Sequence, residues 1–199
     1  MKRLKKSKNK YATAINLFQK KNNLMKIVTF GASNSKNSIN KKLAIYAAHL
    51  FENASVEVLD LNDFQMPLFS VDLELEIGQH DVAKAFLAVI AMADVLVISM
   101  AEHNGNYSTA FKNIFDWSSR INGKVFQDKP MLLLATSPGA RGGASVLEIA
   151  KTAFPRYGAY VKATFSLPSF DANFDIQKGI ITNGEYDIKL KSLIGNFKS

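Results

Sequence analysis

Cysteine is absent from this chain of 199 residues. Its absence excludes disulfides, thiolate metal sites, iron–sulfur clusters and cysteine nucleophiles. Histidine is scarce: only His49, His80 and His103 occur, and their positions lack the spacing of metal ligands. Long apolar runs are also missing, since none approaches the roughly 18–20 residues that a membrane-spanning helix needs. We therefore expect no metal centre of these kinds and no membrane span.

Acidic residues are missing from the first part of the chain, residues 1–24, which carry eight Lys or Arg. From Met25 onward the other 17 basic residues are matched by 17 acidic ones, so the formal net charge of +8 belongs to the beginning of the chain. A neutral remainder does not predict a nucleic-acid-binding surface.

Residues 1–24 also differ in pattern from the rest of the chain. They are rich in Lys and Asn, and strand-like sequence begins directly after them at Met25. We expect a disordered extension at 1–24, or a start codon assigned too far upstream, and a folded domain at 25–199. A role at a membrane surface, on an anionic polymer or in targeting is the alternative. Export is not expected, because the apolar core of a secretory signal is missing.

Strand and helix patterns alternate from Met25 to the end of the chain. Five strands are expected, at Ile27–Phe30, Val56–Leu61, Val95–Ser99, Met131–Thr136 and Ala159–Phe165. Five helices are expected, at Asn40–Glu52, Val82–Met92, Thr109–Arg120, Ala144–Phe154 and Glu185–Phe197. The stretch Asn62–His80 is expected to be irregular, because it contains Pro67 and Gly78 and shows no clear period.

Such alternation predicts an α/β fold in which helices cover both faces of a parallel sheet. Five strands favour a flavodoxin-like three-layer sandwich with the strand order 2-1-3-4-5. In such sheets the ligand lies beyond the carboxyl ends of the strands, where the strand order reverses. The loops after the first, third and fourth strands are therefore the candidate site.

The first of these loops is rich in groups that bind phosphate. It offers hydroxyls and an amide, one cation and no acid, at Ser33, Ser35, Lys36, Ser38 and Asn40. Hydroxyls together with the free N–H groups of a helix start can hold a dianion. The alternative is that Ser38 only caps the helix. A P-loop and a dinucleotide-binding turn both fit worse, because the loop lacks their lysine and glycine spacing.

The other two loops are rich in glycine. Gly105, Gly139, Gly142 and Gly143 let the main chain approach a flat ring without obstruction by a Cβ atom. Ordinary turn formation is the alternative, since glycine is common after strands. The occurrence of three such loops at the same predicted edge of the sheet favours a ligand-binding site over ordinary turns.

Together the three loops resemble the NADPH-dependent FMN reductase family, from about Met25 to Phe165. The first loop is similar to its Gly-Ser-x-Arg-x-x-Ser-x-Asn signature. The second resembles its Pro-x-Tyr-Asn-Gly stretch and the Lys-Asn-x-x-Asp-Trp element after it. The third resembles its Ser-x-Gly-x-x-Gly-Gly segment. The matching residues of the second and third loops are Glu102, His103, Asn104, Gly105, Lys112, Asn113, Asp116, Trp117, Ser137, Gly139, Gly142 and Gly143.

The resemblance implies FMN as cofactor, with NADPH or NADH as co-substrate. It implies that Ser33, Ser38 and Asn40 hold the phosphate of FMN, that residues 102–105 contact the ring and ribityl chain, and that residues 137–143 border the ring. Arg141 is either a solvated loop residue or a contact for the phosphate of the nicotinamide nucleotide. Members of the family are commonly dimers or tetramers, with the helix that bears Asp116 and Trp117 near a subunit interface.

Three residues depart from the family pattern: Ser35 replaces its arginine, Ala101 its proline and His103 its tyrosine. A weaker hold on phosphate and a less rigid loop are the expected consequences. His103 is a surface histidine, a flavin contact or a proton donor in turnover. Lys112 and Asp116, four residues apart on a helix, are expected to form a surface ion pair, and Trp117 to be core or interface. None of the three is expected to be catalytic.

The function that the resemblance implies is that of a cytoplasmic NAD(P)H-dependent oxidoreductase. Bound FMN would pass electrons by ping-pong hydride transfer to a small acceptor such as a flavin or a quinone. We expect no nucleic-acid partner and a homodimer or homotetramer. The alternatives are a non-enzymatic flavodoxin-like electron carrier and a flavin-free binding protein with the same fold.

Overall fold

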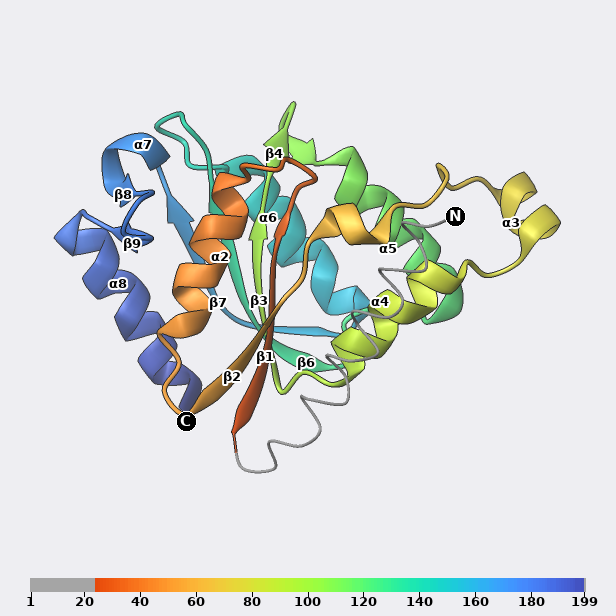
Figure 1. The fold of residues 1–199 in the computed structure, drawn as a ribbon, viewed down its shortest axis with the longest axis horizontal. Coiled ribbons are helices and arrows are strands. Elements are labelled where there is room, and N and C mark those ends of the chain that lie inside the picture. The colour runs from red at the N-terminus through yellow and green to blue at the C-terminus, as the bar shows by residue number, and fades with distance from the viewer. Residues whose placement is uncertain (1–23, 199) are drawn as a thin grey trace.

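A computed structural model describes residues 24–198 and shows a five-stranded parallel sheet with the order β2-β1-β3-β6-β7. In chain order this is 2-1-3-4-5, as predicted (Figure 1). The strands are β1 (Met25–Ala32), β2 (Ala54–Val58), β3 (Val95–Met100), β6 (Lys129–Thr136) and β7 (Ala159–Leu167). Of the predicted extension, only Leu24 lies within the described residues.

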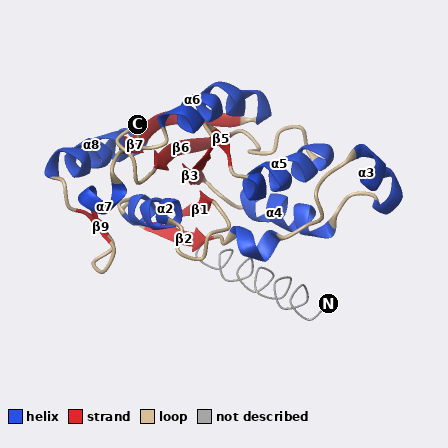
Figure 2. Cartoon of the chain, turned by 90° about the horizontal axis from the view of Figure 1, so that it is seen from above, coloured by secondary structure: helices blue, strands red, loops and turns tan. Residues whose placement is uncertain are grey.

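Helices cover both faces of this sheet (Figures 1 and 2). One face carries α2 (Ile39–His49) and α8 (Gly184–Gly195), and the other carries α4 (Asp81–Ala91), α5 (Thr109–Ile121) and α6 (Ala144–Ala153). In β1, β3 and β6, alternate residues serve the two cores. In β3, for example, Val97 packs on the α2 side and Ile98 on the α5 side. This period of two is the buried-strand pattern of a sheet covered on both faces.

The shorter elements lie between these helices and strands. They are η1 (Leu61–Phe64), α3 (Val71–Ile77), β4 (Glu102–His103), β5 (Asn106–Tyr107), η2 (Phe154–Tyr157), α7 (Phe170–Asn173), β8 (Phe174–Asp175), β9 (Ile180–Ile181) and η3 (Asn196–Lys198). The prediction that 62–80 is irregular was wrong for α3, which Ser70 caps by accepting a hydrogen bond from the Leu73 N–H. None of the residues of α3 is buried, so no core-facing stripe marked it in the sequence.

At the carboxyl end of β1, the first turn of α2 passes against the main chain of Gly31. A Cβ atom at Gly31 would lie 2.3 Å from the Lys41 backbone nitrogen and 2.7 Å from the Lys41 Cα atom. Backbone cannot yield as a side chain can, so α2 sits this close to the sheet only because residue 31 is glycine.

We expect Gly31→Ala to destabilise the protein by about 2–3 kcal/mol, because overpacking against backbone forces α2 away from β1. Chemical unfolding monitored by circular dichroism measures the loss. Gly139→Ala is the matched control, since the nearest atom to its Cβ would be the Ser137 Oγ at 3.9 Å. Equal stability of the two variants would contradict the proposed contact.

Candidate cofactor site

The loops after β1, β3 and β6 meet at the carboxyl edge of the sheet, as predicted. Between them lies a hollow of about 240 Å³. The predicted site residues that line it are Ser33, Ser35, Ser38, Asn40, Glu102, His103 and Ser137. The predicted residues outside its lining are Lys36, Asn104, Gly105, Gly139, Arg141, Gly142 and Gly143. Five lining residues were not predicted from the sequence: Asn37, Ile39, Ala101, Thr136 and Pro138.

Two nearly buried serines give the first loop its shape. The Ser38 Oγ caps α2 by accepting a hydrogen bond from the Lys41 N–H at 3.1 Å. The Ser33 Oγ accepts one from the Ser35 N–H at 3.1 Å. A hydroxyl that accepts from the backbone still has its own hydrogen to donate. Ser38 is therefore a helix cap and, at the same time, a donor available to a ligand in the hollow.

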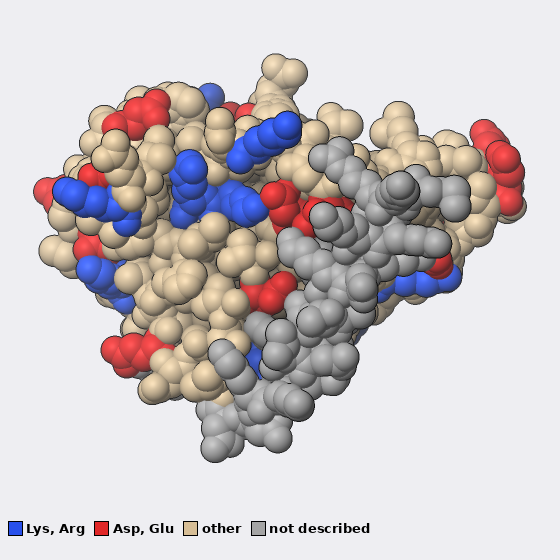
Figure 3. Space-filling model, in the orientation of Figure 1, with Lys and Arg blue, Asp and Glu red and all other residues tan. Residues whose placement is uncertain are grey.

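The start of α2 adds backbone donors to these hydroxyls. Within residues 24–198, the N–H groups of Ile39 and Asn40 have no hydrogen-bond acceptor, and both residues line the hollow. The first turn of a helix also carries a partial positive charge. Figure 3 shows Lys and Arg side chains gathered over the upper part of α2. Hydroxyls, free N–H groups and the helix dipole together make this end of the hollow suitable for an anion.

The side chain of Asn40 has a different role from the expected phosphate contact. Its Oδ1 accepts hydrogen bonds from the Ser99 Oγ at 2.7 Å and from the Thr136 N–H at 3.0 Å. Its Nδ2 donates to the Thr136 carbonyl at 3.1 Å. The residue is 4% exposed. Asn40 therefore joins α2 to β3 and β6 through its side chain, and its backbone N–H is available to a ligand.

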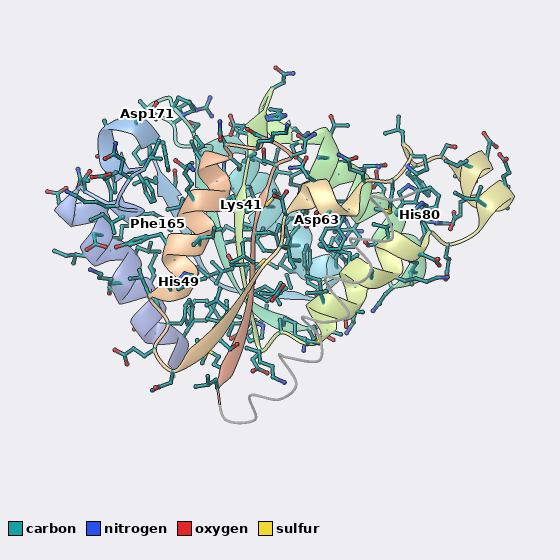
Figure 4. The ribbon with its side chains drawn as sticks, viewed as in Figure 1. Lys41, His49, Asp63, His80, Phe165 and Asp171 are labelled. Carbon is teal, nitrogen blue, oxygen red and sulfur yellow. The ribbon has the colours of Figure 1, made fainter. Side chains whose placement is uncertain are left out.

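Asp60, the N-cap of η1, is paired with Lys41. The Lys41 Nζ donates to the Asp60 Oδ2 at 2.7 Å, and Figure 4 shows Lys41 on the side of α2 that faces η1. Partial burial raises the pKa of Asp60, but hydrogen bonds from Lys41 and Asn62 outweigh it, so the pKa lies below its usual value. Lys41 is thus neutralised locally, whereas Lys36 is exposed on the loop.

The loop after β3 forms a β-hairpin that was not predicted from the sequence. Glu102–His103 pairs antiparallel with Asn106–Tyr107, and the turn residues Asn104 and Gly105 both have positive φ, at 51° and 76°. Two positive φ values and an Asn-Gly pair are typical of a type I′ turn. The Asn-Gly signal was therefore present in the sequence. These two residues form the tip of the hairpin, and β4 delivers Glu102 and His103 to the hollow.

Glu102 and His103 have different surroundings. The Glu102 Oε2 accepts a hydrogen bond from the Val146 N–H in the first turn of α6 at 3.0 Å. The N-cap of α6, Gly143, has no side chain for this purpose, so the carboxylate of Glu102 replaces it and ties the hairpin to α6. His103 is exposed at the rim of the hollow. Of the three sequence interpretations of His103, a position at the rim is compatible with each.

The glycines after β6 are needed for packing. Gly142 has a φ of +57°, and a Cβ atom there would lie 2.4 Å from the Ser166 Oγ. Gly143 has a φ of +74°, and its Cβ would lie 3.0 Å from the Ala135 Cβ. Both let α6 start close to β6 and β7, whereas Ser137 and Pro138 face the hollow. The Arg141 Nη2 donates to the Ser145 Oγ at 2.7 Å and is exposed.

A second hollow, of about 400 Å³, borders the first loop at Asn34 and lies between η1 and the start of α5. Its outer wall, residues 66–69, is held by α5: the Asn113 Oδ1 accepts from the Phe69 N–H, and the Trp117 Nε1 donates to the Pro67 carbonyl at 2.9 Å. Trp117 is fully buried, so it belongs to the core. The expected Lys112–Asp116 surface ion pair is confirmed at 2.6 Å.

Two features are absent from the described part of the chain. Among residues 24–198, no group of three or more His, Asp or Glu could hold a metal ion. In the same residues, no helix combines the length and apolarity needed to cross a membrane.

The strand order defines a flavodoxin-like α/β protein, and the candidate anion site lies at the point where the strand order reverses. The sequence profile of the NADPH-dependent FMN reductase family matches residues 25–171. The chain belongs to this family. It is therefore an oxidoreductase enzyme, with FMN as cofactor and NAD(P)H as electron donor.

Relatives of known name agree with this membership. A 2-hydroxy-1,4-benzoquinone reductase of Burkholderia sp is 36% identical over 122 residues, which cover 60% of this chain and 64% of that protein. A quinone reductase of Escherichia coli K12 is 31% identical over 125 residues, with the same coverage of 60% and 64%. The chain thus spans slightly less than two thirds of these reductases.

Among solved structures, the flavoenzyme NAD(P)H:(acceptor) oxidoreductase FerB of Paracoccus denitrificans is similar, with a TM-score of 0.69 and 22% identity. The match covers 87% of this chain and 95% of that one. An FMN-dependent NADH-azoreductase of Bacillus anthracis, solved in complex with FMN, has a TM-score of 0.60 and 14% identity, over 88% of this chain and 100% of that one. At these identities the likeness establishes the fold.

Proposed function

We propose that this enzyme carries electrons from NAD(P)H to small acceptors, such as quinones or free flavins, in a ping-pong sequence. Donor and acceptor would use the same open position in turn, so that neither must be bound while the other reacts. The relatives named as quinone reductases support the choice of acceptor. The observation that carries the proposal is the turn between β1 and α2, where two serine hydroxyls and the start of a helix offer donors that suit a phosphate group.

The residues of the turn fit the phosphate of FMN. The hydroxyls of Ser33 and Ser38 and the free N–H groups of Ile39 and Asn40 converge on the same end of the hollow. FMN, when bound, supplies the hydride-accepting and electron-donating chemistry of the reaction. The chain itself binds and orients the cofactor, with Lys36 as a nearby cation in place of the family's arginine.

The other two loops would border the ring. Ala101 and the hairpin residues Glu102 and His103 line one side of the hollow, and the loop after β6 contributes Ser137 and Pro138. Because Glu102 accepts a hydrogen bond from Val146 in α6, the hairpin is fixed to the helix that directly follows the third loop, and the two loops form one continuous wall of the hollow. We propose that this wall orients the ring and that no side chain acts as an acid or nucleophile.

The experiment is to purify the full chain, record its visible spectrum, and measure NADH and NADPH oxidation with benzoquinone and with free FMN as acceptors. A yellow protein that oxidises either nucleotide with parallel-line kinetics supports the proposal. A protein that binds FMN but oxidises neither nucleotide favours the electron carrier. A protein that takes up no added FMN contradicts both.

We further propose that the enzyme is a homodimer that uses α3 and the segment before it as its contact. Leu68, Val71, Leu75 and Ile77 are 72%, 59%, 82% and 46% exposed, and α3 projects from the side of the molecule (Figure 1). Apolar side chains gathered on a projecting segment are typical of interaction sites, and most soluble oligomers are two-fold symmetric assemblies of one chain. Leu68 also lines the second hollow, so this contact would lie beside it.

For this contact we expect Leu75→Glu to convert the dimer to a monomer in size-exclusion chromatography with light scattering. The added charge on an apolar interface costs binding energy without disturbing a buried side chain. Ile188→Glu on α8, at a residue 70% exposed, is the matched control and should leave the mass unchanged. A monomeric wild type, or a dimeric Leu75→Glu, contradicts the assignment.

We place the enzyme in the cytoplasm and its FMN-binding domain at residues 25–199. The support for the location is the electron donor, since NAD(P)H is made and kept inside cells. The support for the domain is that β1 begins at Met25, where the family match also begins.

A further inference from the structure

The loop after β6, whose Ser137 and Pro138 face the hollow, is held from its far side by the turn between β7 and α7. The Ser169 N–H donates to the Gly139 carbonyl at 3.0 Å. The Phe170 N–H donates to the Ser137 carbonyl at 3.1 Å. Two successive backbone donors thus fix the two ends of the segment 137–139.

This turn has an unfavourable backbone conformation. Ser169 has a φ of 44° and a ψ of 60°, in the left-handed region that residues with a Cβ atom rarely adopt. The conformation directs the N–H groups of Ser169 and Phe170 toward the same loop. Strained residues of this kind persist where the surroundings hold them, and they concentrate at functional sites.

The surroundings that hold Ser169 come from the C-terminal part of the chain. The Asn173 Nδ2 donates to the carbonyls of Pro168 and Ser169, at 2.9 and 3.3 Å. Phe170 is fully buried and stacks on Phe174, with ring centroids 4.7 Å apart. Figure 4 labels Asp171 in α7, at the same edge of the sheet as the hollow. The family match ends at residue 171, so Asn173 and Phe174 lie beyond it.

A third contact fixes the other end of the same loop. The Ser166 Oγ donates to the Gly142 carbonyl at 3.0 Å. As Gly142 lies too close to β7 for a Cβ atom, the loop and the end of β7 are in direct contact there. The loop after β6 is therefore shaped along its length by residues 166–170, none of which lines the hollow.

We propose that Asn173 is a positioning residue for the cofactor: it holds the strained turn at Ser169, and this turn sets the shape of the loop that borders the FMN ring. The expected effect of Asn173 on FMN binding rests on the proposed function, whereas its expected effect on the loop after β6 does not. The side-chain amide of Asn173 acts as a hydrogen-bond donor here, since both partners of its Nδ2 are carbonyl oxygens. Replacement by the isosteric aspartate removes these donors and places a charge against the two carbonyls.

The test compares Asn173→Asp with Asn183→Asp in the full chain. Asn183 also lies in the C-terminal part of the chain, but its Oδ1 accepts hydrogen bonds from the Glu185 and Tyr186 N–H groups as the cap of α8. Aspartate does this equally well, so the same chemical change is harmless there. Asn173→Ala is the second variant in case the aspartate prevents folding.

Two measurements separate the two levels of the inference. In FMN-free protein, amide hydrogen exchange should rise in residues 137–143 of Asn173→Asp and stay unchanged in Asn183→Asp. In FMN titrations followed by quenching of flavin fluorescence, Asn173→Asp should raise the dissociation constant about tenfold.

Unchanged exchange in residues 137–143 of both Asn173 variants overturns the inference. Increased exchange with wild-type FMN affinity shows that the turn shapes the loop but does not position the cofactor, which also overturns it. A wild type that binds no FMN refutes the proposed function, while hydrogen exchange still tests the turn.

Discussion

Replacing Ser38 with aspartate is expected to abolish tight FMN binding while leaving the protein folded. Aspartate caps a helix as well as serine does, so the cap of α2 is retained. A carboxylate at this position would face the phosphate, and two like charges about 4 Å apart near a protein surface repel each other by about 4 kcal/mol. We expect the dissociation constant of FMN to rise by a factor of at least about 100.

Fluorescence titration with FMN measures the change, and thermal unfolding checks the fold. Ser70→Asp is the matched control, because the Ser70 Oγ caps α3 in the same way, accepting from the Leu73 N–H at 3.1 Å. It should leave FMN affinity unchanged. Wild-type affinity in folded Ser38→Asp would falsify the assignment of the phosphate to this turn.

Replacing Asn40 with alanine is expected to reduce the free energy of unfolding by about 4 kcal/mol. The change leaves the Ser99 hydroxyl and both the N–H and the carbonyl of Thr136 without their partner in a buried environment. Each such orphaned group costs about 1–3 kcal/mol. Urea unfolding gives the value directly.

Asn37→Ala is the control for this prediction, since Asn37 lies three residues away on the exposed part of the loop. A near-neutral effect is expected there. If Asn40→Ala were as stable as Asn37→Ala, the buried network would not contribute as described. Asn40 supports the fold, so replacing both Ser38 and Asn40 by alanine would remove a proposed ligand donor and destabilise the protein at the same time. The two residues must therefore be replaced one at a time.

The fold was largely predictable because its strands are buried on both faces. Ile27–Phe30 is apolar except for Thr29 and Met131–Thr136 is apolar up to Ala135, and each stretch lies inside an observed strand. The expected helix Thr109–Arg120 matches α5, Thr109–Ile121, because its apolar face points to the sheet. Buried positions are apolar and recur with the period of the helix or strand, so they can be recognised in the sequence. The alternation of strands and helices then predicted the strand order.

Two of the missed elements, α3 and the hairpin of residues 102–107, have no such record. In α3 the apolar residues point to solvent, so they mark no core. The hairpin of residues 102–107 is set by the Asn-Gly turn, whose signal is local and was interpreted as space for a ring. In both cases a turn or cap residue, Ser70 or Asn104, carried the information that periodicity did not.

For the site, the sequence by itself determined which loops meet and that the first of them offers donors to an anion. Only the tertiary structure decided which polar groups remain for a ligand. Asn40 and Glu102 lie in the predicted loops, yet their side chains bind Thr136 and Val146, which are 96 and 44 residues away in the chain. A buried polar group must find a partner, and since that partner can come from any part of the chain, the choice is made by packing and leaves no mark in the local sequence.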